Sequence, residues 1–138
     1  MTRICGIELK SSDAILAVVD QGEDGLAHVD TDPKRIRLAN DENTGDVQSF
    51  FDTFCNFIRD NRIDQIVIKK RSKRGQMAGG AVSFKLEGLI QLCGNIPVEL
   101  LSGQSIAAAQ RRSPIEVPAS LNQYQEQAFL TACVWARK

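Results

Sequence analysis

The sequence is poor in the residues on which several kinds of active site depend. Its 138 residues include one histidine, His28, and four cysteines, with no CxxC pair among them. The sequence therefore offers few ligands for a zinc centre and a single histidine for a Ser-His-Asp triad. Each cysteine lies within an apolar pattern, which predicts reduced, buried thiols in a cytoplasmic protein: Cys5, Cys55, Cys93 and Cys133.

Long apolar segments and an excess of charge of one sign are also missing. No apolar run approaches the length of a transmembrane span, and the N-terminus lacks a signal-peptide pattern, so we expect a cytoplasmic protein without a membrane partner. Seventeen basic residues balance 17 acidic ones, and only local clustering can indicate a nucleic-acid partner. Hydrophobic residues make up 43% of the chain, which favours one globular domain over residues 1–138.

The chain does contain a strand-rich first part. Residues 3–9 and 14–19 are rich in Ile, Val and Leu and flank a turn-like segment, which predicts an antiparallel hairpin. A third strand is expected at 26–29 or at 36–38, with Asp32 and Pro33 turning between these two segments.

Strands and helices alternate after this part. Two further strands are expected at 63–68 and 97–101, and apolar residues at helical spacing predict helices over about 47–58, 82–93, 103–112 and 121–136. The order β-β-β-α-β-α-β-α-α predicts an α/β fold with a mixed five-stranded sheet flanked by helices.

Two polar features interrupt this apolar framework. Glu8 lies near the end of the first apolar strand, where a buried carboxylate must be paired, protonated or bound to a cation unless it is exposed. Five basic residues follow the central strand: Lys69, Lys70, Arg71, Lys73 and Arg74. Ligands gather at the carboxyl ends of strands in open α/β sheets, so this segment is a candidate contact for a nucleic-acid backbone. A solvated charge run explains the same residues, and interleaved aromatics for base stacking are absent.

Three stretches carry a resemblance to a known superfamily: GIELKSSDAILAVVD (6–20), the run from IVIKK (66–70) to IPVELL (96–101), and QEQAFLTAC (125–133). They resemble the ribonuclease H-like superfamily, and within it the RuvC-type Holliday-junction resolvases. The resemblance covers nearly the whole chain and points to an uncharacterised bacterial family within the superfamily. It implies a ribonuclease H-like fold in which carboxylates hold two divalent cations for phosphodiester cleavage.

The resemblance implies a site that has lost most of its acids. Glu8 matches the first-strand acid, with Glu in place of the usual Asp. Lys69 falls where the family has an acid on the central strand, and an ammonium there could pair with Glu8 or bind a phosphate. The acidic pair of the last helix falls near Tyr124 and Gln127. Glu126 lies one residue out of register, about 100° around a helix.

Two further acids are candidates on other helices. Asp46 opens the first long helix, where ribonucleases H carry an acid, and Glu87 is a more distant candidate. A nuclease would use Glu8, Asp46 and Glu126 in catalysis, with Glu8 as a ligand of Mg²⁺ or Mn²⁺; no other cofactor is expected.

Three functions therefore stay open. The first is a degenerate member of the superfamily that binds branched or single-stranded nucleic acid, or a partner in nucleic-acid metabolism, through the five basic residues of the segment 69–74. The second is the metal-dependent nuclease, and the third is an oligomeric scaffold, with a homodimer as one form. The first is favoured, because an ammonium beside a Mg²⁺ site repels the ion.

Overall fold

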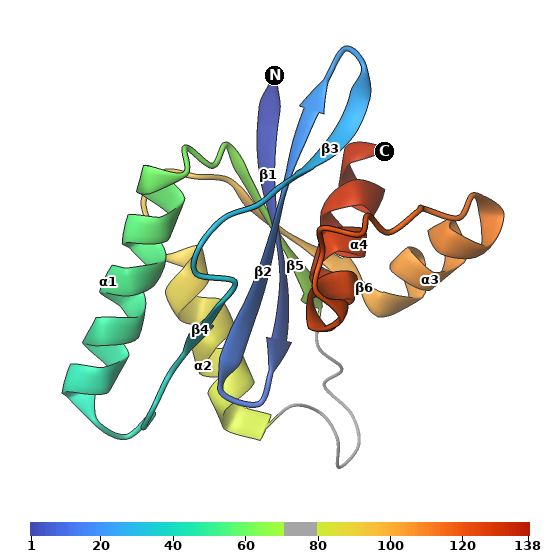
Figure 1. Ribbon diagram of the computed structural model, residues 1–138. Coiled ribbons are helices and arrows are strands. Elements are labelled where there is room, and N and C mark those ends of the chain that lie inside the picture. Colours follow the sequence, from blue (N-terminus) through green and yellow to red (C-terminus); the bar gives the residue numbers. More distant parts are fainter. Residues whose placement is uncertain (71–79) are drawn as a thin grey trace.

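The computed structural model describes residues 1–70 and 80–138 (Figure 1). The strands in these ranges are β1 (Thr2–Lys10), β2 (Asp13–Gly22), β3 (Gly25–Val29), β4 (Arg35–Arg37), β5 (Gln65–Lys70) and β6 (Val98–Ser102). The helices are α1 (Thr44–Asp60), α2 (Gly80–Gln91), α3 (Gly103–Arg112) and α4 (Glu126–Ala136), and a 3-10 turn, η1 (Gln123–Gln125), precedes α4. No helix in the described ranges is long and apolar enough to cross a membrane.

The strands form one mixed sheet in the order β3-β2-β1-β5-β6. β1 pairs antiparallel with β2 and parallel with β5, and β5 pairs parallel with β6. β3 and β4 both pair antiparallel with β2, on the edge that β1 leaves free. The sheet is therefore five positions wide, as predicted, and both segments proposed for the third strand are strands.

Ion pairs hold β4 against the start of β2. Asp13, at the first position of β2, is buried and lies opposite Arg37 in the strand pair. Its carboxylate accepts a hydrogen bond from Arg37 Nε at 3.0 Å and lies 3.5 Å from Arg35 Nη1. A buried carboxylate needs such partners, so these two arginines explain why a segment as short as β4 joins the sheet.

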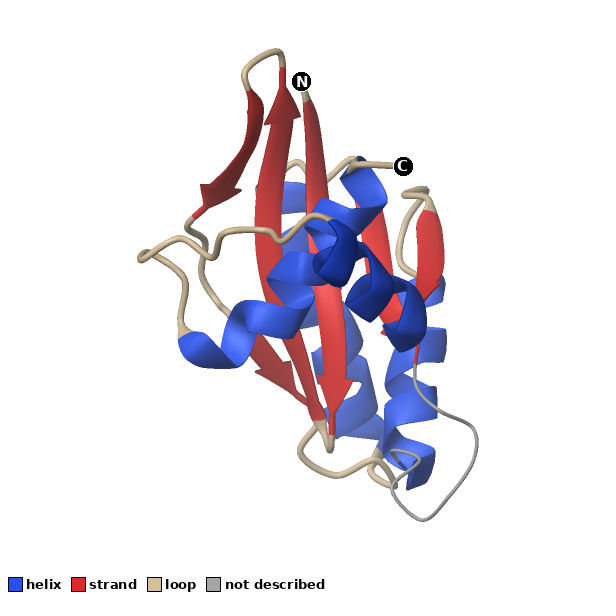
Figure 2. Cartoon of the chain, turned by 90° about the vertical axis from the view of Figure 1, so that its right-hand side faces the viewer, coloured by secondary structure: helices blue, strands red, loops and turns tan. Residues whose placement is uncertain are grey.

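Helices cover both faces of the sheet (Figure 2). α1 and α2 pack on one face, where their buried side chains, among them Phe50, Phe54 and Leu86, form one core cluster. α3 and α4 pack on the other face around a second cluster that includes Ile106 and Phe129. Side chains alternate along the strands and so reach both clusters, which gives the chain two hydrophobic layers.

Gly6 lets α4 lie directly on β1. A Cβ atom at this position would lie 2.0 Å from the carbonyl oxygen of Ala128 and 3.0 Å from the Cβ of Ala132. Small residues on both elements are therefore required for this close approach. The approach brings the first turn of α4 over the carboxyl ends of the central strands.

The last helix begins later than the periodicity predicts. Residues from Leu121 were expected to be helical, whereas α4 starts at Glu126. The buried side chain of Gln125 donates from Nε2 to the carbonyl oxygen of Leu16 at 2.8 Å and accepts from the backbone N–H of Asn122 at 3.1 Å. These contacts favour a tight 3-10 turn before the helix. Tyr124, at the middle of this turn, is 39% exposed.

Candidate functional site

The candidate site lies at the carboxyl ends of the parallel strands β1 and β5. Their paired residues run from Ile4 and Gln65 to Ile7 and Ile68, so Glu8 and Lys69 are the next residues on the two strands. Because side chains alternate along a strand, both residues are on the face that α4 covers. The topology therefore places the acid and the amine side by side.

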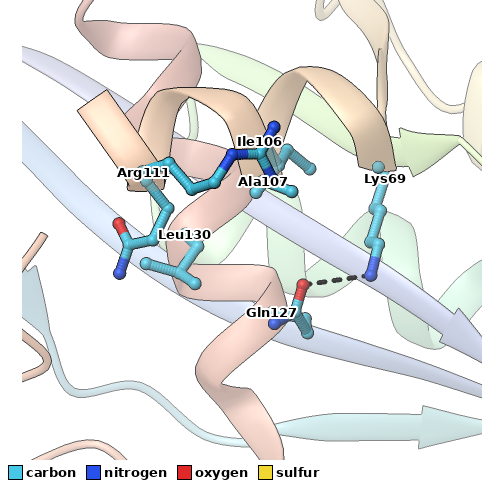
Figure 3. Close-up of a pocket in the computed structure, with 8 residues that line it drawn as sticks. Lys69, Ile106, Ala107, Arg111, Gln127 and Leu130 are labelled. Carbon is cyan, nitrogen blue, oxygen red and sulfur yellow. Dashed lines mark hydrogen bonds between the residues drawn. The ribbon is translucent and has the colours of Figure 1, made fainter. Parts of the chain in front are cut away.

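Lys69 makes a hydrogen bond to α4 rather than to the acid beside it. Its Nζ donates to Oε1 of Gln127, in the first turn of α4, at 3.0 Å (Figure 3). Within residues 1–70 and 80–138, no carboxylate lies within ion-pair distance of this ammonium. The half-buried ammonium of Lys69 therefore contacts a neutral amide, and within the described residues this is the one hydrogen bond that its three N–H donors make.

A pocket of about 360 Å³ opens beside Lys69, between α3 and α4 (Figure 3). Ile106 and Leu130 supply apolar lining, and Arg111 at the end of α3 adds a second positive charge. No carboxylate of the described residues lines this pocket. Its electrostatic character is therefore that of an anion site.

The start of α3 reinforces this character. Ser102 caps α3 by accepting a hydrogen bond from the backbone N–H of Ser105 at 3.0 Å. A Cβ atom on Gly103 would lie 3.4 Å from Cε of Lys69, so the lysine stem passes against the first turn of α3. The positive end of a helix dipole and an ammonium in the same place both favour a bound anion.

The three proposed catalytic acids come from different parts of the fold. Glu8 is half-buried at the end of β1 and makes no ion pair with a described residue. Asp46 lies in the first turn of α1, which with α2, the helix of Glu87, covers the opposite face of the sheet. Glu126 is exposed at the start of α4.

The described residues contain no group of three or more His, Cys, Asp or Glu side chains that could hold a metal ion. The roles of Glu8, Asp46 and Glu126 in catalysis, and of Glu8 as a metal ligand, stay predictions.

The basic residues expected to contact nucleic acid are described only in part. Lys69 is in the pocket, and Lys70 is exposed at the last position of β5. Arg71, Lys73 and Arg74 lie outside the described residues. Arg111 was not recognised as a candidate, because its place in the same pocket as Lys69 depends on how α3 lies against the sheet. The pair of arginines that ends α3 was the available signal.

A family model described as "Protein of unknown function (DUF3010)" matches residues 2–135 of the chain. The chain belongs to this family. Among curated proteins, no sequence match was found for this DUF3010 chain.

Several solved structures share the fold. Thermus thermophilus RuvC superimposes with a TM-score of 0.77 at 11% identity, over 99% of this chain and 96% of that chain. The T. thermophilus RuvC complex with a Holliday junction substrate gives 0.75 at 12% identity, over the same shares of both chains. The yeast mitochondrial Holliday junction resolvase Ydc2 gives 0.61 at 14% identity, over 99% and 79%. The DUF3010 chain therefore has the predicted ribonuclease H-like, RuvC-like fold.

Proposed function

We propose that this DUF3010 protein binds the phosphate backbone of nucleic acid at the carboxyl ends of β1 and β5 and does so without a pair of metal ions. The hydrogen bond between Lys69 and Gln127 carries the proposal. This bond joins Lys69 and Gln127, two positions at which the RuvC resemblance implies metal-binding acids. Branched and single-stranded DNA are the proposed ligands, and the structure of RuvC with a Holliday junction substrate makes a four-way junction the first one to test.

The side chains at this spot do not fit two divalent cations. Mg²⁺ and Mn²⁺ prefer oxygen ligands, mostly carboxylates. Here the neighbour of Glu8 on β5 is an ammonium, and its partner on α4 is a neutral amide. Such a set attracts the anionic substrate directly instead of through a bridging metal.

The same features suit a phosphate group. Within the described residues Lys69 uses one of its three N–H donors, Arg111 lines the same pocket, and the first turn of α3 lies against the Lys69 side chain. Lys70 is exposed at the last position of β5, and Arg71, Lys73 and Arg74 would extend the contact along the backbone. Phosphate contacts of this kind give binding that tolerates many sequences and weakens steeply with salt.

The alternatives have less support. A nuclease built from Glu8, Asp46 and Glu126 would need these acids to converge around metal, and no such group occurs in the described part of the chain. A scaffold without nucleic-acid contact would not account for the half-buried charge of Lys69.

The test is the salt dependence of DNA binding, measured by fluorescence anisotropy with a labelled four-way junction. Each phosphate contact contributes about 0.9 to the slope of log K against log salt, so the Lys69→Gln/Lys70→Gln variant should lose about 1.8 of that slope. Between about 50 and 200 mM salt, the affinity of the wild type should therefore fall about twelvefold more than the affinity of this variant.

A matched control removes the same charge elsewhere. Arg59→Gln/Lys85→Gln lies on α1 and α2, which cover the opposite face of the sheet, and should leave the slope unchanged. Equal losses in both double variants would indicate non-specific attraction. Failure of the wild type to bind DNA at low salt would favour the scaffold.

A further inference from the structure

Two of the four cysteines meet on the face of the sheet opposite the proposed nucleic-acid site. Cys55 belongs to α1 and Cys93 follows the end of α2. Both line a pocket of about 460 Å³ between the C-terminal parts of these two helices. The Cys55 thiol also contributes to the raised pKa of Cys93, which places the two thiols near each other. Residues far apart in the sequence therefore form a dithiol at a solvent-accessible pocket.

The two thiols differ in their access to solvent. Cys55 is half-buried, whereas Cys93 is 2% exposed. Burial, together with the neighbouring Cys55 thiol, raises the pKa of Cys93 to about 12. Cys93 is thus held as a neutral thiol, and Cys55 is the sulfur that a reagent in the pocket reaches first.

The other two cysteines cannot form a comparable pair. Cys5 on β1 belongs to the cluster beneath α1 and α2, and Cys133 on α4 belongs to the cluster on the other face. Both are fully buried. They therefore serve as internal controls for thiol chemistry in the same chain.

We propose that Cys55 and Cys93 form a reversible redox site, at which a small anionic disulfide of the glutathione disulfide class converts the dithiol into an intramolecular disulfide. The anionic class follows from the lining of the pocket. Arg59 and Arg62 both line it. Arg59 is paired with Asp60 at 3.2 Å, whereas Arg62 forms no ion pair within the described residues and is available to an incoming carboxylate.

The chemistry balances in two exchange steps. The thiolate of Cys55 attacks one sulfur of the small disulfide, a mixed disulfide forms at Cys55, and the first small thiolate leaves and takes up a proton. Cys93 then loses its proton to solvent and attacks the Cys55 sulfur, which expels the second small thiolate. The protein loses two electrons and two protons, and one small disulfide becomes two thiols. The product joins α1 to the segment after α2.

The experiment oxidises the full reduced chain with glutathione disulfide, traps free thiols by alkylation and maps peptides without reduction. We expect a monomeric product in which the Cys55 peptide is linked to the Cys93 peptide, and dithiothreitol should reverse the link. The Cys133→Ala variant should give the same link. Cys93→Ala should stop at a glutathione adduct on Cys55.

Several results would overturn the proposal. One is a glutathione adduct that stays on Cys55 of the wild type while Cys93 remains a free thiol. Another is a disulfide between two chains. The third is a wild-type chain in which all four thiols resist oxidation. The wild type alone decides these outcomes, so they do not depend on a variant that folds.

The ligand class has its own test. Arg62→Gln should slow oxidation by glutathione disulfide about threefold, the size expected for one exposed charge, and leave oxidation by the neutral hydroxyethyl disulfide unchanged. The same rate change with both reagents would exclude anion recognition by Arg62.

Discussion

Replacing the pair of Lys69 and Gln127 by two carboxylates tests whether charge excludes a divalent cation from this site. The double variant Lys69→Glu/Gln127→Asp would place two more acids next to Glu8, since Lys69 is its neighbour across the strands and Gln127 contacts Lys69. At about 4 Å and an effective dielectric constant of about 20, a unit positive charge repels a divalent cation by about 8 kcal/mol. Each added carboxylate would attract the cation by a similar amount at the same distance, so loss of the ammonium and gain of the acids both contribute.

The expected gain can be stated as a thermal shift. A created site with a Kd of about 1 mM would stabilise the variant by about 1.4 kcal/mol at about 10 mM Mg²⁺. For a chain of this size, that stabilisation raises Tm by about 3 to 6 °C. The wild type should shift by less than about 1 °C, because a cation that does not bind the native state does not stabilise it.

The assay is thermal unfolding followed by circular dichroism, with and without MgCl₂ or MnCl₂ and with KCl at matched ionic strength. The single variants Lys69→Gln and Gln127→Asp separate loss of the ammonium from gain of an acid. A wild-type shift as large as that of the double variant would refute the reasoning. A folded double variant that ignores both cations would show that the placement of the backbone, and not charge, prevents binding.

Two further predictions concern the framework that positions the site. Gly6→Ala should destabilise the chain by about 3 kcal/mol in denaturant unfolding, because its Cβ would collide with the carbonyl oxygen of Ala128. The control is Gly88→Ala in α2, where a Cβ meets nothing within 4 Å. This variant should be more stable than the wild type by about 0.5 to 1 kcal/mol. The hydrogen bond and charge of Arg3 lower the pKa of Asp20, so this pair should stabilise the fold above about pH 4 and lose that contribution as pH falls through the lowered pKa. Unfolding free energies measured between about pH 5 and 2 should fall less in Asp20→Asn than in the wild type, and parallel profiles would contradict the assignment.

The elements of the fold were predictable from the sequence where the pattern of residues within one segment determines the structure. Apolar runs and helical spacing predicted the hairpin, the central strands and the four helices. The choice between 26–29 and 36–38 for the third strand could not be made locally, because both segments pair with β2 along the same edge. The start of α4 was set too early, because the tertiary hydrogen bond from Gln125 to Leu16 overrides the helical periodicity.

The candidate site was predictable only where a residue type stood out in its own segment. Lys69 was visible as a charge at the end of an apolar strand, and the RuvC resemblance made it a candidate partner of Glu8 or of a phosphate. Its partner Gln127 and the pocket residue Arg111 depend on how α4 and α3 lie against β5. The meeting of Cys55 and Cys93 depends likewise on the packing of α1 beside α2. Such contacts arise where elements that are distant in sequence pack together. The pattern of residues within a single segment carries no information about them.

The central claim is that the ammonium of Lys69, at the end of β5, and the amide of Gln127, at the start of α4, bind the nucleic-acid backbone without metal. The most direct measurement is the affinity of the wild type for a four-way DNA junction in EDTA, set beside its affinity in Mg²⁺ at equal ionic strength. We predict binding in EDTA at least as tight as in Mg²⁺, with the junction left intact in both. Binding that requires Mg²⁺, or cleavage of the junction that Glu8→Gln abolishes, would contradict the account.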